Sequence, residues 1–165
     1  MAVDRDADVS LTTAREPFRS RVHGRLLAAV ALGGLLGGTA RYGLALAFPT
    51  PAGTFPLTTF AVNVSGAFLL ALLLVYLVEV RRRSGSVRPF AAVGFLGSYT
   101  TYSTWMFDTE RLLGGGHCTL AVLNVLGSLL AGLAATALGL AVGRRVPAVA
   151  GDVRSRFRNR FRRIP

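Results

Sequence analysis

The chain has 165 residues, of which 52% are hydrophobic and nineteen are basic, and its formal net charge is +11. A mean hydropathy of +0.48 is too high for an ordinary soluble domain of this length. The single cysteine, Cys118, excludes a framework of internal disulfides, and the two histidines, His23 and His117, lie too far apart in sequence for metal-ligand spacing.

Four long hydrophobic stretches predict four transmembrane helices. They cover residues 26–48, 55–78, 89–107 and 118–143. A bilayer core takes about 20 predominantly apolar residues per helix, and each stretch is close to that length or longer. The first stretch contains one charged residue, Arg41, and the other three contain none. The expected fold class is therefore an all-α integral membrane protein.

Three parts of the chain differ in polarity. We expect a polar N-terminal tail over residues 1–24, one four-helix transmembrane domain over 25–145 and a basic C-terminal tail over 146–165. In the last part, Phe157 and Phe161 recur at helical spacing among arginines. This tail is either an amphipathic segment that lies on anionic membrane lipid or a disordered tail that only enforces topology.

All nineteen basic residues are arginine, and their distribution predicts the topology. Seventeen lie before the first stretch, between the second and third, or after the fourth, whereas the loops on the other side contain only Arg111. Because arginines in short loops stay cytoplasmic, we expect a multi-pass protein of the inner or plasma membrane with both termini in the cytoplasm. Nucleic-acid binding is another interpretation of so basic a chain, but the arginines lie where topology requires them, so no nucleic-acid partner is expected.

The first stretch contains paired glycines and its one charge. Gly33 and Gly37 are four residues apart, as are Gly34 and Gly38, and small residues at this spacing let helix backbones approach closely. Arg41 lies well inside the stretch, where a charge is costly and faces a partner or water. It either reaches the outer interface or places a cation at the mouth of an aqueous cavity that attracts anions.

Amides and hydroxyls recur on single faces of the second and fourth stretches. Asn63 stands among apolar residues with Thr59 one turn before it, and Asn124 and Ser128 are four residues apart. A buried amide must find hydrogen-bond partners. Asn63 is therefore either a clasp between helices or a polar position along a path for ions.

The third stretch predicts a broken helix. Residues 98–104 all carry a hydroxyl group, and Gly94 and Gly97 come just before them. Glycine weakens a helix, and hydroxyls can bond backbone groups in non-helical conformations. Non-helical backbone at membrane depth is tolerated where it is buried in protein or lines a cavity. A break would expose carbonyl oxygens, which suit hard cations such as Na⁺.

Two aromatic residues follow the expected break. Tyr102 and Trp105 are three residues apart, so their rings share a helix face. Ring edges carry positive potential and can meet a small anion.

These motifs together resemble the CrcB/Fluc family of fluoride channels. The resemblance covers roughly residues 26–143 and rests on four segments: GGLLGGTARY, TTFAVNVSG, GFLGSYTTYSTWMFD and NVLGSLLAGLAATALG. It implies an antiparallel dimer of four-helix subunits with two anion pores, which exports fluoride passively and protects the cytoplasm. It also implies a structural Na⁺ at the dimer interface, held by backbone carbonyls at the positions of Gly97 and Thr100.

The resemblance also implies which residues line the pore. The family's pore asparagine matches Asn63, and its two pore phenylalanines fall on Tyr102 and Trp105. The remaining polar positions fall on Ser103, Thr104, Thr59 and Ser128, with the vestibule arginine at Arg41.

The chain departs from the family pattern at the expected pore. It reads TTYSTW where the family reads TTFSTF, Ser98 replaces the second glycine of the break, and Asp108 replaces a glutamate. Two interpretations stay open, a conducting subunit and a non-conducting partner in a heterodimeric channel. Because the arginine bias fixes one orientation, an antiparallel dimer needs an oppositely oriented paralogue, so a heterodimer is expected before a homodimer.

Other functional classes fit less well. A small four-helix multidrug transporter needs a membrane-embedded carboxylate, but the acids nearest a span, Asp108 and Glu110, come at the end of the third stretch. A non-transporting assembly protein leaves Asn63 and the broken helix unexplained. No nucleophile–base pair or paired carboxylates suggest an enzyme.

Overall fold

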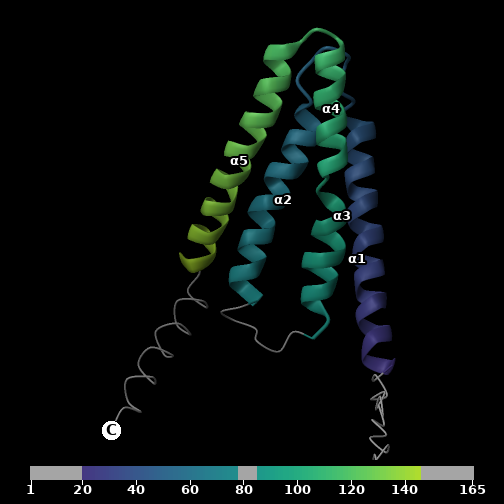
Figure 1. Ribbon diagram of the computed structural model, residues 1–165. Coiled ribbons are helices and arrows are strands. Elements are labelled where there is room, and N and C mark those ends of the chain that lie inside the picture. The colour runs from purple at the N-terminus through teal and green to yellow at the C-terminus, as the bar shows by residue number, and fades with distance from the viewer. Residues whose placement is uncertain (1–19, 78–84, 146–165) are drawn as a thin grey trace, which may run out of the picture.

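The computed structural model describes residues 20–77 and 85–145, and all regular elements in these ranges are helices (Figure 1). The elements are α1 (Ser20–Ala47), α2 (Leu57–Val75), the π-helical segment η2 (Pro89–Leu96), α3 (Gly97–Tyr99), α4 (Tyr102–Gly114) and α5 (Cys118–Arg145). The all-α prediction is confirmed for the described residues. Most of the two predicted tails lies outside them, although α1 begins at Ser20, inside the predicted N-terminal tail.

Three of the four predicted spans are continuous helices that are long and apolar enough to cross a membrane: Gly24–Ala47, Leu57–Val75 and Cys118–Arg145. The third predicted span is divided between η2–α3 and α4, as its glycines and hydroxyls predicted. Its predicted end at residue 107 was wrong, because α4 continues to Gly114. Glycines, and not the loss of hydrophobicity, end this helix, since Gly116 has a φ of 78° that favours glycine.

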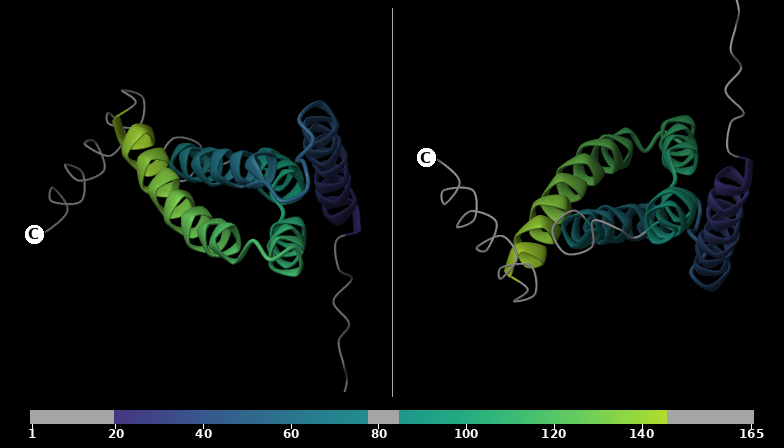
Figure 2. Two further views of the ribbon diagram at one scale, coloured as in Figure 1. Left: turned by 90° about the horizontal axis from the view of Figure 1, so that it is seen from above. Right: turned by 90° about the horizontal axis from the view of Figure 1, so that it is seen from below.

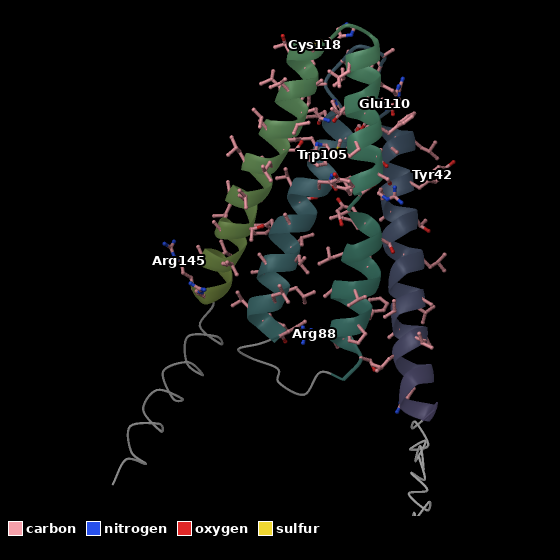
Figure 3. The ribbon with its side chains drawn as sticks, viewed as in Figure 1. Tyr42, Arg88, Trp105, Glu110, Cys118 and Arg145 are labelled. Atoms are coloured by element: carbon pink, nitrogen blue, oxygen red, sulfur yellow. The ribbon has the colours of Figure 1, made fainter. Side chains whose placement is uncertain are left out.

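The helices run roughly along one direction (Figure 1). The connections over residues 48–56 and 115–117 lie at one end, hereafter the loop end, and the start of α1 and the end of α5 lie at the other, the terminal end. Figure 2 shows α1 and α5 on opposite sides of α2 and α3. Arg88 and Arg145 both lie toward the terminal end (Figure 3), in agreement with the expected clustering of arginines on one side.

Glycines bring α1 against η2. A β-carbon added at Gly33 would meet the carbonyl oxygen of Phe90, and one at Gly37 would meet the carbonyl oxygen of Phe95. Gly94 of η2 faces the same contact from the other side, because a β-carbon there would lie 3.0 Å from the Cα of Gly33. Backbone therefore packs directly on backbone, as the spacing of Gly33 and Gly37 predicted.

Glycines also bring α5 close to α2. A β-carbon at Gly139 would lie 2.9 Å from the Cβ of Ala71, and one at Gly143 would lie 2.9 Å from the Cβ of Val75. By contrast, Gly127 and Gly132 have nothing within 4 Å, so only part of the glycine content of α5 serves this contact.

Large apolar side chains cover the outside of the helices. Leu35 is 66% exposed, Leu130 67% and Leu133 61%. Such a surface suits lipid, because apolar side chains lose nothing in hydrocarbon. The chain is therefore a membrane protein with several helices able to span the bilayer.

The glycine contact between α1 and η2 yields a matched pair of substitutions. We expect Gly37→Ala to destabilise the protein by about 1–3 kcal/mol, because the added methyl group overlaps the Phe95 carbonyl group. Gly38→Ala, one residue further along α1, has nothing within 4 Å and should leave stability unchanged or raised. Thermal unfolding of both variants in detergent measures the difference, and equal melting temperatures would contradict this account of the packing.

Candidate functional site

The break in the third span lies at two consecutive threonines. Thr100 has φ −74° and ψ 159°, and Thr101 has φ −148° and ψ 123°, so both are extended. Helical hydrogen bonding stops here, which frees carbonyl groups at the end of α3 and N–H groups at the start of α4. A site in the middle of the helix bundle thus has backbone polar groups that need partners.

Asn63 of α2 binds both backbone groups of Thr101. Its Nδ2 donates to the Thr101 carbonyl oxygen at 2.9 Å, and its Oδ1 accepts from the Thr101 N–H at 2.8 Å. A side-chain amide has both a donor and an acceptor, so one residue can satisfy both backbone groups. The interpretation of Asn63 as a clasp between helices is confirmed, and a position on an ion path remains compatible with it.

Hydroxyl groups complete the two helix ends. The Thr101 Oγ1 accepts from the Thr104 N–H at 3.1 Å and so caps α4, while the Thr100 hydroxyl donates to the Leu96 carbonyl oxygen at 3.0 Å. Ser103 is exposed, with its Oγ 3.3 Å from the Thr101 Oγ1. The hydroxyl run therefore satisfies backbone at the break, as the sequence predicted.

Arg41 also binds the end of α3. Its Nε donates to the Ser98 carbonyl oxygen at 3.1 Å, and the side chain is half-buried. A cation at the carboxyl end of a helix is favourable, because the last carbonyl oxygens carry partial negative charge. Neither interpretation from the sequence named this partner, since the partner is a backbone carbonyl group 57 residues away.

Tyr102 and Trp105 meet edge to face. Their ring centroids are 5.5 Å apart with an interplanar angle of 67°, which confirms that the two rings share a face of α4. The two side chains differ in their surroundings. Tyr102 is 72% exposed, whereas the half-buried Trp105 donates its Nε1–H to the Asn124 carbonyl oxygen at 3.1 Å.

Asn124 is the buried centre of the contact between α4 and α5. It has no exposed surface, and its Nδ2 donates to the Thr109 Oγ1 at 2.9 Å and to the Trp105 carbonyl oxygen at 3.4 Å. The Ser128 Oγ lies 3.5 Å from its Oδ1, at the long limit of a hydrogen bond. The spacing of Asn124 and Ser128 predicted a shared face, but nothing in the sequence pointed to Thr109.

Thr59 lies apart from these residues. Its hydroxyl donates to the Asp108 Oδ2 at 2.7 Å. Asp108 is half-buried, although its sequence position suggested the end of a span. The reason is that α4 extends past it by almost two turns.

One cavity of about 370 Å³ opens beside the break and is lined in part by Asn63, Gly97, Thr100, Thr101, Tyr102 and Trp105, hereafter the break cavity. It brings together five of the ten predicted site residues. The others do not line it: Arg41, Thr59, Ser103, Thr104 and Ser128. Apolar residues of α2 and η2 form the rest of its wall. Because its wall combines the residues of the break, an amide-bearing residue and two aromatic residues, the cavity is the candidate site.

A family model described as CrcB-like protein, camphor resistance (CrcB), matches residues 28–140. The chain belongs to this family. The matched residues include all of α2, the break and α4, together with most of α1 and α5.

Curated relatives carry the name fluoride-specific ion channel. FluC 3 of Streptomyces avermitilis is 72% identical over 127 residues, which are 77% of this chain and 62% of that protein. FluC 1 of Streptomyces coelicolor is 39% identical over 148 residues, covering 88% of this chain and 96% of that protein. FluC 2 of S. avermitilis is 46% identical over 101 residues, covering 60% of this chain and 64% of that protein. The chain thus spans less than two thirds of two of these relatives.

The clasp at the break yields a test by hydrogen exchange. We expect Asn63→Leu to speed amide exchange in the segment 97–105 at least about tenfold, because each unsatisfied backbone group costs about 1–3 kcal/mol. Thr136→Val is the control, since within the described part of the chain the Thr136 hydroxyl bonds the Gly132 carbonyl oxygen of its own helix. Mass spectrometry of the exchanged peptides measures both, and equal exchange in the two variants would contradict the role of Asn63.

Proposed function

We propose that this chain is a subunit of a fluoride-specific ion channel that exports cytoplasmic fluoride passively and so lowers its toxicity. The observation that carries the proposal is the break cavity, because Asn63, Tyr102 and Trp105 line it together in a member of the CrcB-like family. The choice of fluoride as the ion rests on the relatives, which are named fluoride-specific ion channels.

The chemistry of the cavity suits a small anion. Tyr102 and Trp105 can present ring edges, which carry positive potential, and Tyr102 is 72% exposed. Asn63 uses one of its two amide N–H groups at Thr101, so the other is available as a donor. Ser103, Thr104, Thr59 and Ser128 extend the proposed path with hydroxyl groups, and Arg41 contributes a positive charge beside the break.

We propose an antiparallel dimer of four-span subunits, with η2, α3 and α4 together as the third span. The openness of the break cavity and the exposure of Tyr102 support a second subunit, which would close the cavity into a pore. Non-helical backbone at membrane depth needs cover by protein or a water-filled cavity, and Thr100 and Thr101 are such backbone.

The break also offers ligands for a structural Na⁺ at the dimer interface. Gly97 and Thr100 line the open cavity, and the turn to extended backbone after Tyr99 removes the helical acceptor role of nearby carbonyls. A β-carbon at Gly97 would come no closer than 3.8 Å to other atoms, so its surroundings are open. The described residues hold no cluster of His, Cys, Asp or Glu that could bind a metal, whereas carbonyl oxygens suit hard cations.

The partner in the dimer is proposed to be a paralogous subunit of opposite orientation. The arginine bias favours one orientation with both termini in the cytoplasm, and an antiparallel homodimer requires two. Two FluC proteins of S. avermitilis are both similar to this chain, so one organism can encode paralogues. In such a pair, the departures at Tyr102 and Trp105 allow one of the two pores to be non-conducting.

The function is tested by fluoride efflux from liposomes that contain this chain together with an oppositely oriented paralogue. We expect fluoride efflux above that of empty liposomes, and chloride efflux at least about tenfold slower, because a narrow and partly desolvated path suits the smallest halide. Tyr102→Ala should slow the efflux, whereas Tyr42→Ala, which alters an exposed tyrosine of α1 (Figure 3), should not.

The outcomes of this experiment are distinct. No fluoride efflux with verified insertion would refute the channel. Efflux that Tyr102→Ala leaves unchanged would support the non-conducting alternative for this subunit's own pore. Equal efflux from this chain alone, with C-terminal reporters found on both sides of the membrane, would refute the heterodimer.

The sodium site is tested by thermal unfolding in Na⁺ and in K⁺. We expect Na⁺ to raise the melting temperature of the dimer, because an ion that binds only the folded state stabilises it. Gly97→Val should abolish this increment, because its side chain would occupy the open space proposed for the ion, while Thr100→Ser should retain it, since the proposed ligand there is a backbone carbonyl. Equal melting temperatures of the unaltered protein in the two salts would contradict the site.

A further inference from the structure

A second cavity, distinct from the break cavity in its chemistry, lies between α2, η2 and α5. It is an open groove of about 470 Å³, hereafter the apolar groove, lined by residues that include Leu69, Leu72, Leu73, Tyr76, Phe95 and Gly143. Among the described residues of its wall, the one polar side-chain group is the hydroxyl of Tyr76, which follows the end of α2 and is 43% exposed. A tyrosine at the rim of an apolar surface is typical of the headgroup level of a membrane.

Arginines flank this groove on two sides. Gly143 of its wall is followed directly by Arg144 and Arg145, and Ala91 of its wall lies one turn after Arg88. All three arginines are exposed, and Figure 3 shows Arg88 and Arg145 toward the terminal end, on either side of the end of α2. The acidic residues that the structure describes, Asp108 and Glu110, both belong to α4, and Glu110 lies near the loop end (Figure 3).

We propose that the apolar groove binds an anionic phospholipid of the leaflet at the terminal end. An acyl chain lies along Leu69, Leu73 and Phe95, and the phosphate group lies between Arg88 and Arg144. Basic pockets between membrane helices bind anionic headgroups in this way. The phospholipid supplies both an apolar chain and a negative charge, whereas an apolar helix of a second subunit would leave the arginines without counter-charge.

This inference does not depend on fluoride permeation. It uses only the groove, the exposed arginines and the membrane setting of the helices. A subunit that conducts no ion would still have this lipid site, so failure of one proposal leaves the other testable.

The test is native mass spectrometry of the purified full chain in detergent, titrated with phosphatidylglycerol or with phosphatidylcholine of the same acyl chains. We expect phosphatidylglycerol to bind more tightly than phosphatidylcholine. Arg88→Gln and Arg144→Gln should each weaken its binding about fivefold, as expected for one arginine near the membrane surface. Ala91→Phe, which narrows the groove, should weaken binding of both lipids.

The matched control is Arg25→Gln, which removes one arginine near the start of α1, where no wall of the groove lies. It should change phosphatidylglycerol binding by less than about twofold, because Arg25 lies outside the proposed site. A general attraction between arginines and the anionic lipid would instead make Arg25→Gln as harmful as Arg88→Gln. Circular dichroism and size exclusion verify folding of every variant. Equal affinity for the two lipids, or an equal effect of Arg25→Gln and Arg88→Gln, would overturn the proposal. Loss of the dimer in Ala91→Phe with lipid binding unchanged would assign the groove to a second subunit and overturn it as well.

Discussion

Two hydrogen bonds between Asn63 and the backbone of Thr101 hold the break between α3 and α4. Hydrocarbon offers no partner for a free N–H or carbonyl group, so a break at membrane depth persists only where side chains replace the lost helical bonds. The amide does this for both groups of one residue, at 2.9 and 2.8 Å. The two bonds hold the backbone at the start of α4, from which Tyr102 and Trp105 reach the break cavity.

Close helix packing supports the break from outside. Glycines at positions 33, 37 and 94 bring the backbones of α1 and η2 into contact, which sets Arg41 within 3.1 Å of the Ser98 carbonyl oxygen. On the other side, Gly66 leaves room for the Thr100 methyl group. The break is thus held from both α1 and α2. Small residues let the helix backbones come close together, and polar side chains then reach the backbone at the break.

The two aromatic residues of α4 have different surroundings. Trp105 is fixed by its N–H bond to Asn124, which has no exposed surface, whereas Tyr102 is 72% exposed and touches Trp105 with its ring. A phenylalanine at position 105 could not make this hydrogen bond. Tryptophan at this position therefore attaches α4 to α5 and also contributes a ring to the wall of the break cavity.

The sequence by itself determined the helical class, the hydrophobic spans, the broken third helix and the residues Asn63, Tyr102 and Trp105, since hydropathy, glycine and hydroxyl content act locally along the chain. The tertiary structure alone decided the partners. Arg41 binds Ser98, Thr59 binds Asp108 and Asn124 binds Thr109, and α4 extends beyond the apolar stretch to Gly114. These pairings join residues from 15 to 57 positions apart, and such distances depend on how helices pack and not on any local pattern.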